Sequence, residues 1–297
     1  MDQYIKGEEL FNWYQEAKLR GNTLNISTIE LNYLLAEFTS LDSLAIKLQS
    51  YQNKEKIESR KSLAELEELW QWRIIAKKPI QQIIGKCYWR DMTLKVSGDV
   101  LIPRPETELM IDIADNFVRQ YPSFKQGNWL DLGTGSGAIA LALSQIFPQA
   151  TIYAVDKSEQ ALEIARKNAI DLGLEKNIKF YQGNWFTPVI KLQHKISGIV
   201  TNPPYIPSKI IPTLQPEVAK YEPKIALDGG EDGLSDIREI INDSANFLVE
   251  KGMLLIEIME GQALEIINIL ESTNSYCTIR SYRDLANIER FIFAQKK

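Results

Sequence analysis

The sequence has little of what metal binding or triad catalysis requires. Its 297 residues include two cysteines, Cys87 and Cys277, and one histidine, His194. The cysteines lie far apart and do not form the spacing of a metal-ligand pair, and a single histidine cannot supply a ligand cluster. We therefore expect no metal site and no Ser-His-Asp or Cys-His catalysis. So few cysteines are typical of a protein in a reducing cytoplasm.

Long apolar runs and excess positive charge are also missing. No stretch reaches the ~18 consecutive apolar residues of a membrane span, and residues 1–6 lack the basic-then-apolar form of a secretory signal. The 34 basic and 39 acidic residues give a net charge of −5. Because nucleic-acid binders usually carry a basic surface, this weighs against a DNA or RNA substrate. We expect a cytoplasmic monomer that neither associates with membranes nor binds nucleic acid stably.

What the sequence does have is a series of short apolar runs that alternate with helical patterns. Five runs occupy residues 129–132, 151–155, 178–183, 196–200 and 252–258, and residues 276–282 and 290–294 add two more at the end of the chain. This alternation predicts an α/β fold with a doubly wound, Rossmann-like sheet of seven strands. The last two strands are joined by a short polar turn, so they must pair antiparallel.

The region before this sheet has a different pattern. Residues 1–78 are predicted to form a small all-helical domain, with capping boxes at Ser27 and Ser62 that start two of the helices. The aromatic pairs 13–14 and 70–72 are interpreted as core. Residues 79–102 are predicted to form a β-hairpin linker, with strands at 83–89 and 92–96. The remaining segment, 103–297, contains the sheet.

The fourth apolar run is followed by Thr201-Asn202-Pro203-Pro204-Tyr205. Two prolines cannot continue a strand, so this motif marks the carboxyl end of the strand, where open α/β sheets bind ligands. Asn202 and the carbonyl of Pro203 can accept the two hydrogens of a planar NH2 group while Tyr205 stacks on its plane. Taken alone, the motif is better explained as a proline-rich turn with a packed tyrosine.

A glycine-rich segment follows the first apolar run, in the order Asp131-Leu132-Gly133-Thr134-Gly135-Ser136-Gly137. Glycines there allow the backbone to approach a ligand closely at a helix N-terminus. The second run ends at Asp156, 19 residues after Gly137, which suits a carboxylate that binds ribose hydroxyls. The pattern is G-x-G-x-G without a Walker lysine, so we favour S-adenosyl-L-methionine over NAD, FAD or ATP.

Three further features are open to two interpretations each. Trp185 follows the third run and either covers an adenine ring or packs beneath its own loop. Arg104, with Glu106 and Glu108, either stabilises the helix that begins near Thr107 or forms part of a substrate wall. The long segment 206–227 has no regular pattern, and such loops are often lids or binding elements.

Together these motifs resemble the S-adenosylmethionine-dependent methyltransferases that modify a glutamine side chain in class-one peptide chain release factors. The matching segments are 101–108, 131–140, 156, 184–186, 202–205, 222–234 and 283–290. Asn-Pro-Pro-Tyr also occurs in adenine-N6 DNA methyltransferases, but the flanking segments 102–108 and 222–233 separate the two families. Tyr88-Trp89 replaces the usual Glu-Phe of the hairpin. We expect that difference to affect domain orientation and not chemistry.

The resemblance implies a class I methyltransferase domain at 103–297 and a substrate-recognition domain at 1–78. It implies methyl transfer from S-adenosyl-L-methionine to the amide nitrogen of a glutamine in the Gly-Gly-Gln motif of release factors, a step that serves translation termination. The implied cofactor contacts are Gly133, Thr134, Gly135, Ser136, Gly137, Asp156, Trp185 and Asn202. The implied substrate contacts are Asn202, Pro203, Pro204 and Tyr205, with Asn202, Pro203 and Tyr205 catalytic.

Two alternatives remain. An adenine-N6 nucleic-acid methyltransferase would use the same motif to hold a flipped base, but it would need a basic surface. A methyltransferase fold that has lost catalysis would act as a binding module. The presence of both Asp156 and Asn202 argues against that second alternative.

Overall fold

The computed structural model describes residues 3–297. Met1 and Asp2, the first residues of the predicted helical domain 1–78, lie outside the described range. The chain divides into two compact units. The first contains the residues up to Gly85 together with Pro216–Tyr221, and the second contains Lys86–Gln215 and Glu222–Lys297. No helix within residues 3–297 is long and apolar enough to cross a membrane.

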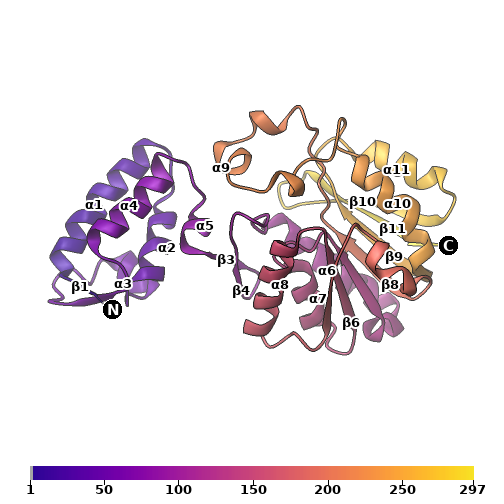
Figure 1. Cartoon of the computed structure of the whole chain (residues 1–297), viewed down its shortest axis with the longest axis horizontal. Helices are drawn as coiled ribbons and strands as arrows, with labels where there is room; N and C mark the ends of the chain where they lie inside the picture. Colours follow the sequence, from indigo (N-terminus) through magenta and orange to yellow (C-terminus); the bar gives the residue numbers. More distant parts are fainter. Residues whose placement is uncertain (1–2) are drawn as a thin grey trace. The chain divides into compact units, whose positions relative to one another are not determined.

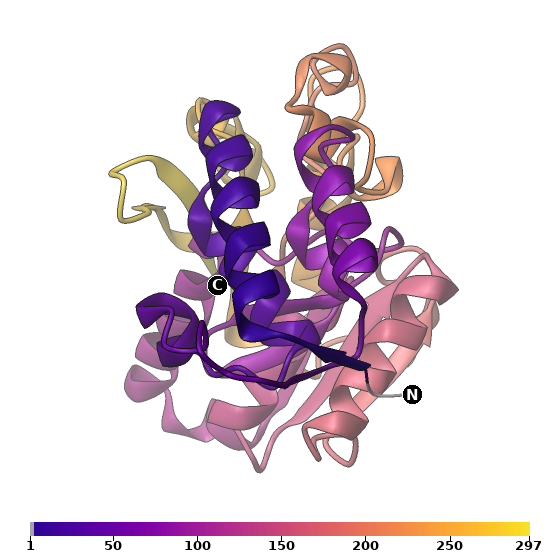
Figure 2. The ribbon, with the colours of Figure 1, turned by 90° about the vertical axis from the view of Figure 1, so that its left-hand side faces the viewer.

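The first unit is built mainly from helices. They are α1 (Gly7–Thr23), α2 (Thr28–Phe38), α3 (Ser43–Leu48), α4 (Leu63–Ile74), α5 (Ile80–Ile84) and, from the later segment, α9 (Pro216–Ala219). An antiparallel ladder between β1 (Gln3–Ile5) and β2 (Ile57–Ser59) makes the all-helical prediction wrong in this detail. Each strand has three residues, too few for an alternating pattern to be recognised. Figure 2 shows β1 leading into the N-terminal end of α1.

The two predicted capping boxes have different outcomes. Ser62 and Glu65 form a complete box at the start of α4. Ser27 caps α2 by accepting a hydrogen bond from the Ile29 amide, but the box is not closed. Glu30 instead forms an ion pair with the guanidinium of Arg73. A tertiary charge partner therefore replaces the local contact.

The aromatic residues of this unit mostly lie in its core, as predicted. Trp13, Tyr14 and Trp70 are buried, and the indole N–H of Trp70 donates to the Ala17 carbonyl at 3.1 Å. Trp72 was interpreted wrongly, because its side chain is 41% exposed. Two positions after Trp70 on the same helix, Trp72 points away from the face that Trp70 buries.

Segment 216–221 joins this unit by specific contacts. The Arg73 guanidinium forms an ion pair with Glu217 at 3.0 Å. The Gln82 amide donates to the Tyr221 carbonyl, and the Tyr221 hydroxyl donates to the Ala76 carbonyl, each at 2.8 Å. A piece of the long loop after Tyr205 is thus held by the helical residues.

The second unit contains a seven-stranded sheet in the order β10-β11-β9-β8-β5-β6-β7. Its strands are β5 (Asn128–Leu132), β6 (Thr151–Asp156), β7 (Ile178–Gln182), β8 (Ile196–Thr201), β9 (Leu248–Glu257), β10 (Tyr276–Arg283) and β11 (Glu289–Lys296). Each strand pairs in parallel with its neighbour across β9, β8, β5, β6 and β7. Strand β11 is antiparallel to both β9 and β10. The predicted fold class and the antiparallel pairing of the last two strands are confirmed.

Helices cover both faces of this sheet (Figure 1). On one face are α6 (Leu109–Gln120), α7 (Ala138–Ile146) and α8 (Glu159–Asp171), and on the other are α10 (Ser235–Phe247) and α11 (Ala263–Ser272). Neighbouring strand residues alternate between the two cores: Met253 and Leu255 pack with α6 and α7, while Leu254 and Ile256 pack with α10 and α11. A strand buried on both sides reads as a continuous apolar run.

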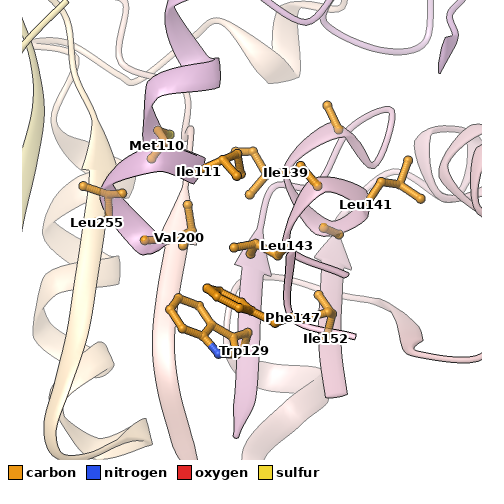
Figure 3. Packing of buried hydrophobic residues seen from close by; sticks show 14 of the residues in the cluster. Met110, Ile111, Trp129, Ile139, Leu141, Leu143, Phe147, Ile152, Val200 and Leu255 are labelled. Atoms are coloured by element: carbon orange, nitrogen blue, oxygen red, sulfur yellow. The ribbon is translucent and has the colours of Figure 1, made fainter. Parts of the chain in front are cut away.

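Trp129 organises the first of these cores (Figure 3). Its ring stacks on Phe147 with centroids 4.8 Å apart, and its N–H donates to the Phe124 carbonyl at 3.0 Å. Gly198 on the neighbouring strand leaves room for the indole, because a Cβ at that position would lie 2.3 Å from a ring carbon. This packing aligns β5 with β8, the two strands whose ends carry the glycine loop and Asn202.

The hairpin at the start of the second unit consists of β3 (Lys86–Trp89) and β4 (Met92–Lys95). The predicted first strand began too early, because Ile83 and Ile84 belong to α5, which Gly85 ends with a φ of 74°. Trp89 is buried, and its indole N–H donates to the Arg104 carbonyl at 2.8 Å. Trp89 therefore helps to fix the segment that carries Arg104.

Candidate active site

A cavity of about 260 Å³ lies at the carboxyl ends of β5, β6 and β8. It brings together residues that the sequence analysis selected from separate motifs. Those that line it are Gly133, Thr134, Gly135, Ser136, Asp156, Trp185, Asn202 and Pro204. Gly137, Pro203 and Tyr205 are not among the lining residues. Parallel strands place their carboxyl ends at one edge, which is why motifs so distant in sequence converge.

The glycine loop leaves space that any side chain would fill. Gly133 has a φ of 72° and Gly135 a φ of 54°, conformations that favour glycine. A Cβ at Gly133 would lie 3.6 Å from the Trp185 ring and 3.8 Å from the Asn202 carbonyl oxygen, both of which border the cavity. Gly137 serves packing instead, since its Cβ would approach Ala165 on α8 to 3.1 Å.

Asp156 ends β6 and faces both the loop and the next helix. Its carboxylate accepts hydrogen bonds from the amide of Gly135 at 2.8 Å and from the amide of Ser158 at 2.9 Å. Burial raises the pKa of this carboxyl, and the backbone donors oppose that effect. Each carboxylate oxygen has a second lone pair for a ligand hydroxyl. Residues Asp156, Gly133 and Gly135 therefore fit the ribose and backbone contacts of a nucleoside cofactor.

Asp131 stabilises the same loop from within the core. Its side chain is fully buried and accepts hydrogen bonds from the Thr134 hydroxyl at 2.6 Å and from the Ala140 amide at 3.0 Å. Burial raises its pKa to about 7. These two bonds hold the turn that leads into α7, so Asp131 shapes the loop without lining the cavity.

Trp185 lies in the loop after β7 and borders the cavity. The residue that packs beneath this loop is its neighbour Phe186, which is buried and stacks on Phe247 with ring centroids 4.5 Å apart. Trp185 itself is half-buried with a φ of 42°. Its ring also packs against the core on the α10 and α11 face, so both interpretations stay open and the contact with an adenine stays a prediction.

Asn202 and Tyr205 meet a polar group that the sequence analysis did not select. The Asn202 side-chain amide donates to the Thr107 hydroxyl at 3.4 Å, and that hydroxyl donates to Glu257 at 2.7 Å. The Tyr205 hydroxyl donates to the other oxygen of Glu257 at 3.3 Å. Glu257 ends the apolar strand β9. In the sequence, Glu257 lies within the apolar run 252–258, and a carboxylate inside such a run is the signal that could have selected it.

Arg104 and its acidic neighbours have separate roles. Arg104 lines the cavity, and its guanidinium binds both carboxylate oxygens of Glu222 at 2.7 Å. Glu108 instead accepts a hydrogen bond from the Arg90 amide of the hairpin at 2.9 Å. Arg104 thus forms part of the cavity wall, and its contact with a substrate stays a prediction.

The long loop after the motif contains more structure than expected. It includes the 3-10 turns η4 (Ile211–Thr213) and η5 (Lys224–Ala226) as well as α9. Its later part reaches the cavity, where Pro223, Ile225, Ala226 and Asp228 contribute to the lining. Within residues 3–297, no three His, Cys, Asp or Glu side chains are grouped so that they could hold a metal ion.

Solved structures show what the fold resembles. The hMettl16 catalytic domain in complex with MAT2A 3′UTR hairpin 6 is similar with a TM-score of 0.57 and 12% identity, covering 88% of this chain and 91% of that one. Human methyltransferase 10 domain containing protein is similar with a TM-score of 0.51 and 17% identity, covering 69% and 89%. At such low identity, both likenesses concern the fold alone.

Sequence comparisons are more specific. Residues 123–291 match the family model described as a methyltransferase domain. The release factor glutamine methyltransferase of Synechocystis sp. is 44% identical over 98% of both chains. The protein of the same name from Thermosynechococcus vestitus is 42% identical over 98% of this chain and 99% of that one. This chain belongs to the release factor glutamine methyltransferase family.

Proposed function

We propose that this protein transfers a methyl group from S-adenosyl-L-methionine to the side-chain amide nitrogen of a glutamine in class-one release factors, within their Gly-Gly-Gln motif. One observation supports this most strongly. A single cavity joins the glycine loop, Asp156 and Asn202 at one edge of the sheet. The nucleoside-binding face and the amide-binding group that we propose would thus be adjacent, as methyl transfer to an amide requires.

The cofactor would be held by residues that already have a suitable geometry. Asp156 would accept hydrogen bonds from the ribose hydroxyls, with its orientation fixed by the amides of Gly135 and Ser158. The backbone at Gly133 and Gly135 would approach the ligand closely, and the Trp185 ring would cover its adenine. Thr134, Ser136 and Asn202 complete the set of cofactor contacts that we propose, while Gly137 contributes by allowing α7 to pack on α8.

Positioning carries most of the proposed mechanism. S-adenosyl-L-methionine supplies an electrophilic methyl group. An amide nitrogen is a poor nucleophile because its lone pair is delocalised, so the protein must hold it in line at near-contact distance. Asn202 Oδ1 and the Pro203 carbonyl would accept the two N–H bonds, Pro204 would border the amide, and Tyr205 would complete its packing. As positive charge develops on nitrogen, these preorganised acceptors stabilise it. The proton can leave after transfer.

The first unit would serve substrate recognition. We propose a helical recognition domain at 1–78, a hairpin linker at 79–102 and a methyltransferase domain at 103–297. Residues 3–78, the described part of the helical region, offer no polar constellation suited to chemistry, and the complete cavity lies within the second unit. We further propose that the enzyme acts as a monomer in the cytoplasm and modifies factors of translation termination.

The alternative of an adenine-N6 nucleic-acid methyltransferase is not favoured. The likeness to the hMettl16 catalytic domain concerns the fold alone, at 12% identity. The net charge of −5 offers no overall attraction to phosphate. The relatives that match almost the whole chain carry the glutamine methyltransferase name.

Mass spectrometry tests the proposed function. A class-one release factor is incubated with the enzyme and S-adenosyl-L-methionine, and the peptide that contains Gly-Gly-Gln is analysed. We expect a gain of one CH2 group located on the glutamine. A factor in which that glutamine is replaced by asparagine is the matched control. Modification of another residue, or of adenine in added DNA or RNA but not of the factor, would contradict the proposal.

A further inference from the structure

Glu257 is a carboxylate in an unusual place. It is the last residue of β9, which pairs with β8, the strand that leads into the Asn-Pro-Pro-Tyr motif. The last residue pair between these two strands is Thr201 with Ile256, directly before Asn202 and Glu257. Its side chain is 1% exposed, and it does not line the cavity. A buried carboxylate is costly unless its oxygens are satisfied, so its partners indicate what it does.

Those partners all lead to the amide-binding motif. One oxygen of Glu257 accepts from the Thr107 hydroxyl at 2.7 Å, and the other accepts from the Tyr205 hydroxyl at 3.3 Å. Thr107 in turn is 3.4 Å from the side-chain nitrogen of Asn202. Thr107 is itself buried, with 4% exposure. The contacts therefore form a chain from Glu257 through Thr107 to Asn202.

The directions of these hydrogen bonds follow from which atoms can donate. An ionised carboxylate only accepts, so the single hydroxyl hydrogen of Thr107 is directed to Glu257. The Thr107 oxygen can then only accept from its other neighbour. The part of the Asn202 amide that faces it must be the NH2 group, which leaves Oδ1 on the opposite side. That is the orientation in which Asn202 can accept an N–H from a glutamine amide.

We propose that Glu257 is a positioning residue, which in its ionised form acts through Thr107 to hold the Asn202 amide with Oδ1 toward the substrate nitrogen. It also anchors the Tyr205 ring through the phenol hydroxyl. This inference rests on the proposed function, because it assigns the role by reference to a bound glutamine amide.

The charge state of Glu257 is balanced by its surroundings. Burial raises its pKa to about 7, while Thr107, Tyr205 and Arg290 lower it and Glu106 raises it further. Arg290 is itself paired with Asp284 at 3.3 Å, and Arg104, which acts on Tyr205, is paired with Glu222.

Protonation of Glu257 would reverse the direction of the hydrogen bonds that link it through Thr107 to Asn202. A protonated carboxyl can donate to the Thr107 oxygen, which frees the threonine hydrogen to point at Asn202. The Asn202 amide would then turn its oxygen to Thr107 and its NH2 to the substrate NH2, where two donors face each other. Methyl transfer should therefore require the ionised form and should become faster as pH rises through about 7.

The test is the pH dependence of the single-turnover methylation rate with saturating cofactor. For the unaltered enzyme we expect a rate that rises with pH and levels off above neutrality. Glu257→Gln should lower the plateau on the order of tenfold, the worth of about one hydrogen bond, and should abolish the rise. Thr107→Val should behave alike, and combining the two should cost little more than either. Thr107→Ser keeps the hydroxyl and should keep the pH dependence.

Two controls separate positioning from damage to the fold. Glu108 follows Thr107 directly, but its carboxylate accepts a hydrogen bond from the hairpin residue Arg90. Glu108→Gln should therefore leave the pH dependence of the methylation rate unchanged. Cofactor affinity of Glu257→Gln, measured by calorimetry, should stay near that of the unaltered enzyme. If Glu257→Gln keeps the rate and the pH profile, the inference is wrong while the proposed function stands. If the unaltered enzyme does not methylate the factor, the proposed function fails and the inference fails with it.

Discussion

The Asp156 carboxylate has a structural role and, we propose, a role in cofactor binding. It holds the glycine loop and the start of α8, and we propose that it also binds the ribose. Asp156→Ala should weaken S-adenosyl-L-methionine binding about tenfold to a hundredfold, because hydrogen bonds to a charged group contribute roughly 1.5 to 3 kcal/mol. Calorimetry measures this affinity.

The matched control is Ser62→Ala, which removes a capping hydroxyl that accepts from the Glu65 amide at the start of α4 and does not line the cavity. It should lower the melting temperature without a comparable loss of affinity. A folded Asp156→Ala variant with normal cofactor affinity would show that this carboxylate serves the loop alone.

Glu257 also makes a prediction about stability. Its folded pKa of about 7 lies above the ordinary glutamate value of 4.5, so between these two pH values the folded state retains a proton that the unfolded state releases. The stability linked to this group is therefore fully present at low pH and is lost as pH rises from about 4.5 to about 7. The melting temperature of Glu257→Gln minus that of the unaltered enzyme should therefore be larger at pH 8 than at pH 5. Thermal scans of both proteins at both values measure the difference; an equal difference at the two pH values would contradict the assigned pKa. Asp131 is present in both proteins, so its own titration cancels.

The elements of the sheet illustrate what a sequence can predict. Buried strands appear as apolar runs, so β5, β6, β8 and β9 and the order of motifs along them were predictable. The edge strand β7 is only partly buried and was predictable from its place in the alternation of strands and helices. Three-residue strands such as β1 and the five-residue helix α5 carry too little pattern to be recognised. The Gly and Asp positions of the glycine loop were recognised because they form a local motif. The link from Glu257 to Asn202 was not, because it joins strands through tertiary contacts.

The packing of β5 against β8 depends on the small size of Gly198 beside the Trp129 ring. Gly198→Ala would place a methyl group 2.3 Å from the Trp129 ring, so the strands must shift. We expect a loss of about 1–3 kcal/mol in the free energy of unfolding, as for other overpacked cores. Denaturant unfolding measures it. Combining Gly198→Ala with Trp129→Leu should cost less than the sum of the single changes, and strict additivity would mean that the two sites do not contact.

For the whole molecule, the division into two units predicts a division of labour. Deleting residues 1–78 removes none of the cavity-lining residues, so cofactor affinity should be preserved. Methylation of an intact release factor should fall sharply, whereas methylation of a short peptide that contains Gly-Gly-Gln should change little. Calorimetry and a methylation assay with both substrates measure these effects. Equal rates on the intact factor for the truncated and full-length enzymes would contradict a recognition role.

The proposed mechanism depends on Asn202 holding the substrate amide, and the decisive measurement is the single-turnover methylation rate of Asn202→Ala at saturating cofactor. Removing one preorganised partner should lower the rate ~10²- to 10³-fold, in a protein that still folds. Tyr205→Phe should cost much less than Tyr205→Ala because the ring is retained. A rate for Asn202→Ala close to that of the unaltered enzyme would show that the motif is a structural turn and would contradict this mechanism.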